Sequence, residues 1–68
     1  MNVIKAIELV GSSSASFEEA VKNAIYEAKK TLRNIRRVEI MDFEVLMEND
    51  EPSLYQARIK LFFEVERS

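Results

Sequence analysis

The 68-residue sequence contains no cysteine and no histidine, and it has a single glycine and a single proline. The missing cysteines exclude disulfide bonds and thiolate metal ligands, and the missing histidines exclude imidazole ligands and the commonest general base. A chain of this length buries only about 60% of its unfolded surface and is marginally stable alone. The length allows one domain, residues 1–68. Because small folds usually need an additional stabilising device, we expect this domain to form a homo-oligomer.

The sequence also lacks an excess of positive charge and a long apolar run. Ten Lys and Arg residues against twelve Asp and Glu residues give a net charge of −2, whereas nucleic-acid-binding proteins usually show a marked basic excess. No apolar run approaches the roughly 20 residues that cross a bilayer, and Lys5 and Glu8 make the N-terminal stretch unlike a signal peptide. We therefore expect a cytoplasmic protein that binds neither nucleic acid nor membranes.

The last segment, residues 54–66, alternates without interruption and predicts a strand with one wholly apolar face. That apolar face consists of Tyr55, Ala57, Ile59, Leu61, Phe63 and Val65. The opposite face is mixed in character and carries Gln56, Arg58, Lys60, Phe62, Glu64 and Glu66.

Residues 2–10 predict a first strand, which Gly11 and the following serines should end. Ser16 and Glu19 have the spacing of a capping box, in which Ser16 caps a helix and Glu19 reaches back to it. The helix that follows has an apolar stripe at three-four spacing, made of Phe17, Val21, Ala24, Ile25, Ala28 and Leu32. Asn34 is a plausible terminator of this helix.

Residues 38–48 predict a second strand, and residues 49–53 predict a five-residue turn before the last strand. Met41, Phe43, Val45 and Met47 share one face of this second strand. Val38, Ile40 and Leu46 on the opposite face break the alternation, which indicates a bulge or a second buried patch.

The predicted architecture is an α+β fold of order β-α-β-β. The three strands form an antiparallel sheet of order 1-3-2, because the first and second strands cannot be direct neighbours in a purely antiparallel sheet. The helix should cover the apolar face of residues 54–66 and leave the other face bare. We expect that bare face to be an association surface, carrying Phe62, Ile40, Ile4 and Leu46.

Candidate chemistry is limited to a few side chains. Gln56 is an uncharged amide on the bare face, and its donor and acceptor could read the edge of a planar heterocycle; a solvated or inter-subunit glutamine is the alternative. Asp42 and Glu44 could form an acid–base pair, although charged strand edges usually have this pattern. The carboxylates at 48, 50 and 51 could bind calcium, or they could belong to a solvated hairpin turn.

Several segments, in this order, resemble the dodecin family. They are Ile7-Glu8-Leu9-Val10-Gly11-Ser12-Ser13, Phe17-Glu18-Glu19-Ala20, Thr31-Leu32-Arg33-Asn34-Ile35-Arg36, Val38-Glu39-Ile40, Tyr55-Gln56 and Phe63-Glu64-Val65. The resemblance implies a β-α-β-β subunit in a hollow dodecamer that stores or sequesters a flavin, riboflavin or FMN, without catalysing a reaction. It also implies that Gln56 binds the flavin ring edge.

The sequence departs from the family pattern at the rest of the flavin site. The resemblance aligns Arg37 with the tryptophan that stacks on the flavin, and this chain has no tryptophan. Glu44 and Glu64 stand where bacterial members have basic residues toward the flavin phosphate. We therefore expect a flavin site with Gln56, Arg37 and Glu44, in which Arg37 either lines the ligand or forms an inter-subunit ion pair. The alternative is a dodecin-like cage without flavin, which could hold calcium or another small ligand.

Overall fold

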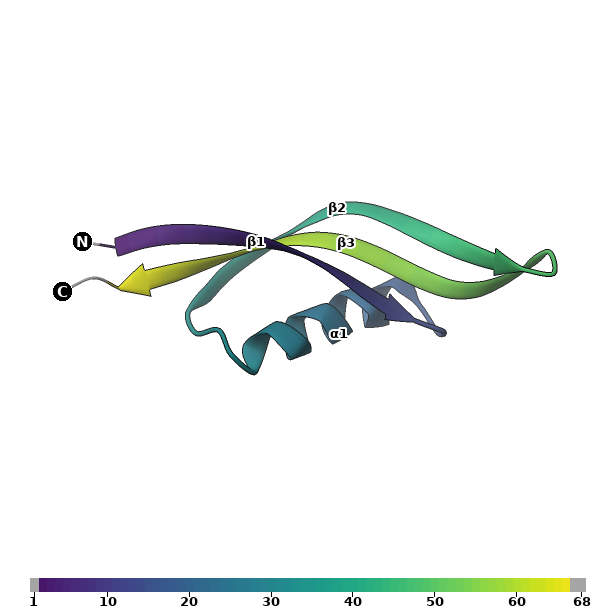
Figure 1. Ribbon diagram of the computed structural model, residues 1–68, viewed down its shortest axis with the longest axis horizontal. Coiled ribbons are helices and arrows are strands. Elements are labelled where there is room, and N and C mark those ends of the chain that lie inside the picture. Colours follow the sequence, from purple (N-terminus) through teal and green to yellow (C-terminus); the bar gives the residue numbers. More distant parts are fainter. Residues whose placement is uncertain (1, 67–68) are drawn as a thin grey trace.

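The computed structural model describes residues 2–66, so the ends of the predicted domain at 1, 67 and 68 lie outside the described residues. The elements are β1 (Asn2–Ser13), α1 (Phe17–Lys29), β2 (Ile35–Glu48) and β3 (Glu51–Glu66). Figure 1 shows α1 beneath the twisted sheet, with the β2–β3 hairpin extending well beyond the helix. The predicted β-α-β-β order is confirmed.

The central strand is β3, which pairs antiparallel with β1 on one side and with β2 on the other. This confirms the predicted strand order and the central place of the last strand. The register sets Gln56 opposite Ser12 of β1 and opposite Glu44 of β2. Because directly opposed residues of paired strands share a face, these three side chains lie on the same side of the sheet.

The first strand is longer than predicted because Gly11 does not end it. Gly11 pairs with Ala57 in regular register, and β1 continues to Ser13. A Cβ atom at position 11 would overlap the carbonyl oxygen of Ala20. The glycine is therefore required by the close approach of α1 to β1, and not by a turn.

The two chain reversals around β2 also differ from the prediction. The helix ends at Lys29, and Asn34 adopts a left-handed φ of 61° in the connection before β2, so Asn34 does not terminate the helix. The β2–β3 turn contains only Asn49 and Asp50, with φ of 53° and 63°, because Glu48 already pairs with Glu51.

The helix start confirms one half of the predicted capping box and contradicts the other. The Ser16 hydroxyl accepts a hydrogen bond from the Glu19 backbone N–H at 3.0 Å, as an N-cap should. The Glu19 carboxylate does not reach back to Ser16, and instead accepts a hydrogen bond from the Ser13 hydroxyl at 2.9 Å. Ser13 in turn accepts from the Ser16 backbone N–H at 3.3 Å, so Ser13 takes the role expected of Glu19.

The core lies between α1 and the β1–β3 part of the sheet. The buried apolar residues are Ala20, Ala24, Ala28, Ala57, Ile59 and Leu61. The alanines let the helix approach closely, and Leu9, Val21, Ile25 and Val38 pack around them. The predicted burial of residues 57, 59 and 61 beneath the helix is confirmed.

The helix covers β2 least, and bulges in β2 change which residues face it. The register shifts between Ile40 and Asp42, which confirms the expected bulge. Ile40 therefore lies opposite Ile59 on the helix side of the sheet, and its predicted place on the bare face was wrong. An apolar strip on this side of β2 stays largely exposed, although Phe43 within it packs on Phe17 of α1 with ring centroids 4.6 Å apart. We call it the β2 strip; it consists of Ile40, Phe43, Val45 and Met47.

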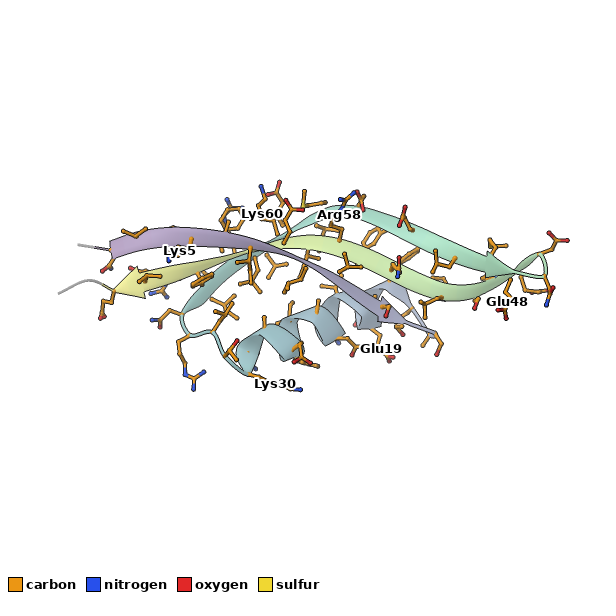
Figure 2. All side chains as sticks on the ribbon, in the orientation of Figure 1. Lys5, Glu19, Lys30, Glu48, Arg58 and Lys60 are labelled. Carbon is orange, nitrogen blue, oxygen red and sulfur yellow. The ribbon has the colours of Figure 1, made fainter. Side chains whose placement is uncertain are left out.

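The side of the sheet away from α1, which we call the open face, is bare as predicted. Ile4 and Leu46 are both exposed, whereas Phe62 is only half-exposed. Figure 2 shows Arg58 and Lys60 on the side of the sheet opposite α1. The radius of gyration is 14.2 Å, compared with about 11 Å for a compact chain of this length. No helix among residues 2–66 is long and apolar enough to cross a membrane.

Candidate functional site

The candidate site is a shallow depression on the open face, at the point where all three strands contribute side chains. Its volume is about 210 Å³, and its lining consists of Val10, Asp42, Glu44, Gln56 and Arg58. The register produces this arrangement, because Gln56 and Arg58 are two residues apart on β3 and lie opposite Glu44 and Asp42 of β2. The structure thus brings two of the predicted site residues, Gln56 and Glu44, side by side.

The amide of Gln56 is available to a ligand. Gln56 is half-buried in the lining of the depression, and the structure records no hydrogen bond from this amide to another described residue. Glutamine offers one carbonyl acceptor and two N–H donors. A ligand with a flat amide-like edge can therefore both donate to and accept from Gln56.

The charges of the depression are only partly balanced. Arg58 donates a hydrogen bond to the Asp42 carboxylate at 2.8 Å, and this bond together with the charge of Asp42 raises the pKa of the Arg58 guanidinium. Glu44 forms no ion pair with another described residue. The pairing of Asp42 with Arg58 leaves the carboxylate of Glu44 as the uncompensated charge beside Gln56.

Arg37 lies apart from this depression within one chain. Its guanidinium stacks over the ring of Phe62, 3.7 Å from the ring centroid, and Phe62 is six residues from Gln56 along β3. At about 3.3 Å per residue this places the two positions roughly 20 Å apart. A single ligand of flavin size can contact both Arg37 and Gln56 only if they come from different copies of the chain.

Glu64 is the second acidic residue that stands where the resemblance places a basic one. Neighbours on the same side of the sheet bind its carboxylate. Arg36 donates to its carboxylate at 2.7 Å, and the Asn2 side chain donates to it as well. This carboxylate is thereby occupied at the end of the sheet far from Gln56.

Sequence reasoning missed Arg58 and Val10 as parts of the site. Arg58 follows Gln56 by two residues in an alternating strand, so its place on the same face was readable from the sequence. Val10 contributes through the pairing of β1 with β3, which depends on the register. No group of three or more carboxylates within residues 2–66 is placed to hold a metal ion.

Nearly the whole described chain matches one protein family. The family model for dodecin matches residues 3–66. The chain belongs to the dodecin family. The dodecin from Streptomyces coelicolor superposes with a TM-score of 0.93 at 30% identity, over 98% of this chain and 96% of that one. A mutant dodecin from Thermus thermophilus superposes with a TM-score of 0.92 at 30% identity, over 98% of this chain and all of the other.

Among curated proteins, the chain is 23% identical over 65 residues to the calcium dodecin of Mycobacterium tuberculosis. The match covers 96% of this chain and 92% of the relative. The resemblance to dodecins drawn from the ordered segments is confirmed, and so is the predicted dodecin subunit fold. Within the dodecin fold, the depression around Gln56 is a feature of the open face of the sheet.

Proposed function

We propose that this dodecin-family protein is a non-catalytic flavin-binding protein that acts as a homo-oligomer, a dodecamer, and stores or sequesters its ligand. The observation that supports a flavin most directly is the unengaged amide of Gln56 in the lining of a depression on the open face. The pyrimidine edge of a flavin presents alternating carbonyl and N–H groups, which an amide can pair with.

The shape of the subunit supports the proposed assembly. An elongated chain with a bare open face and an exposed β2 strip buries too little apolar surface to be stable alone. Arg37 of a second copy could then line a ligand bound at Gln56 of the first, because Arg37 and Gln56 of the same chain are too far apart to contact one ligand. The stack on Phe62 holds the guanidinium flat, so that its other face can contact an aromatic ring.

A non-catalytic role agrees with the groups in the depression. Asp42 is tied to Arg58, which weakens the case for an acid–base pair of Asp42 and Glu44, and the lining contains no serine, threonine, lysine or tyrosine that could act as a nucleophile. The uncompensated carboxylate of Glu44 would repel a phosphate. We therefore propose that riboflavin binds more tightly than FMN.

The test is quenching of riboflavin and FMN fluorescence by purified protein from which small molecules have been removed. We expect quenching by wild type, stronger binding of riboflavin than of FMN, and a loss of about 5- to 100-fold for Gln56→Ala, since one or two hydrogen bonds are removed. Ser53→Ala, on the same strand but outside the depression, is the matched control. Unchanged fluorescence with wild-type protein would refute flavin binding.

A second candidate is a flavin-free dodecin cage that binds calcium. Two observations favour it: the neighbouring carboxylates of Asp42 and Glu44 in the depression, and the similarity to a protein named calcium dodecin. One chain supplies too few ligands in this depression for the six to eight oxygens that calcium takes, so copies would have to share the ion. Calorimetric titration with calcium tests this candidate, and it fails if no heat of binding is measured and the melting temperature stays constant.

A further inference from the structure

A second groove of the subunit is basic and apolar, and it lies far from Gln56. It has a volume of about 470 Å³ and is formed where the end of α1 meets the start of β2. We call it the basic groove; it is lined by Ile25, Lys29, Leu32, Arg33, Asn34 and Ile35. Neither Lys29 nor Arg33 forms an ion pair within residues 2–66, so both positive charges are available to a partner.

A surface of matching chemistry lies at the β2–β3 hairpin. The two-residue turn makes this end of the molecule narrow, and its side chains are exposed acidic and apolar groups. We call it the acidic tip; it consists of Leu46, Met47, Glu48, Asp50 and Glu51. Met47 is 58% exposed, and its flexible thioether can adapt to an irregular apolar surface. The structure records no ion pair of these three carboxylates with other described residues.

The groove and the tip cannot meet within one chain. Figure 1 places the hairpin turn at one end of the long axis and the end of α1 toward the other, and Figure 2 shows Glu48 and Lys30 correspondingly far apart. The molecule is 54 Å long. An occupant of the groove with the tip's chemistry must therefore come from a second copy.

We propose that the acidic tip of one subunit docks into the basic groove of the next. Met47 would cover the apolar lining, and the three carboxylates would lie near Lys29 and Arg33. This contact joins two different surfaces, so it is heterologous and repeats from subunit to subunit until a ring closes. The contact rests on the homo-oligomer that we propose above, and it leaves the depression at Gln56 free.

Charge reversal on each side of the contact tests it. Lys29→Glu/Arg33→Glu makes the groove acidic, and Glu48→Lys/Glu51→Lys makes the tip basic. In either variant, like charges face each other. We expect the concentration at which the assembly half-dissociates, measured by mass photometry and light scattering, to rise about ten-fold or more. A chain carrying all four substitutions restores opposite charges and should assemble nearly as well as wild type.

Lys22→Glu/Lys30→Glu is the control, because it changes the net charge by the same amount at positions that do not line the groove, at the cost of two exposed ion pairs with Glu18 and Glu27. It should dissociate at the wild-type concentration. If a reversed variant loses its far-UV circular dichroism signal, the neutral pairs Lys29→Gln/Arg33→Gln and Glu48→Gln/Glu51→Gln replace it.

Two outcomes would refute the proposed contact without touching the homo-oligomer. One is that the reversed or neutral double variants stay assembled like wild type. The other is that the chain with all four substitutions dissociates as readily as the double variants. A wild-type protein that is monomeric would overturn the proposed homo-oligomer as well. A wild-type protein that assembles but does not quench riboflavin fluorescence would count against the flavin site and would not affect the proposed contact.

Discussion

Replacing Gly11 with alanine tests the closest approach between α1 and the sheet. The added Cβ would overlap the Ala20 carbonyl oxygen and lie 2.9 Å from the Ala24 Cβ and 3.1 Å from the Ala20 carbonyl carbon. Two of these three atoms belong to the helix backbone, so no side-chain rotation can relieve the contact. The helix must move away from β1, and this separates the buried alanines of α1 from the strand residues that they pack against.

The magnitude follows from the cost of overpacking. Inserting a methyl group into a well-packed core costs about 1–3 kcal/mol, and a backbone clash belongs at the upper end. Alanine also lowers the conformational entropy of the unfolded chain, which offsets about 0.4–1 kcal/mol of this loss of stability. We therefore expect Gly11→Ala to lower the free energy of unfolding by about 2–3 kcal/mol, or the melting temperature by roughly 10–20 °C.

The assay is thermal and urea unfolding followed by circular dichroism at one protein concentration, because assembly makes stability concentration-dependent. Ser12→Ala, next in sequence but on the open face, should stay close to wild type. Adding Ala24→Gly should not restore stability, since it removes only the Cβ contact. A Gly11→Ala protein within about 0.5 kcal/mol of wild type would refute the close approach of helix and strand.

Two further substitutions test the turn and the helix cap. Asn49→Ala should cost about 1 kcal/mol in urea unfolding, because Asn49 has a left-handed φ of 53° that alanine disfavours, whereas Asn49→Gly should cost nothing; equal losses for both would contradict this account. Ser16→Ala should cost about 1 kcal/mol, since it removes the acceptor of the Glu19 N–H bond; Ser14→Ala, at an exposed bend, is the control, and an equal loss there would rule out a capping effect.

The strongest patterns in the sequence predicted the fold correctly. The alternation of residues 54–66 identified the central strand and its buried face, because such a strand must bury one side and pair on both edges. The three-four stripe and Ser16 located the helix, because its start depends on local chemistry. These signals each depend on neighbours within a few residues of each other.

The errors concern features that depend on distant parts of the chain. Gly11 was interpreted as a strand breaker, although its role is to admit the Ala20 carbonyl, which only the packed helix reveals. Ile40 was assigned to the wrong face, because a bulge reverses the alternation and its position is set by pairing with β3. Strand register likewise places Glu44 beside Gln56 and sets the distance between Gln56 and Arg37.

The bulges of β2 have a further consequence for misassembly. The sheet of order β1-β3-β2 has two edge strands, whose outer backbone groups can pair with another chain and seed aggregates. The register of β2 shifts at three places, which bends and twists that edge and makes it a poor template. β1 pairs over twelve successive residues without a shift. The regular edge of β1 is therefore where we expect fibril-like growth to begin if subunits accumulate unassembled.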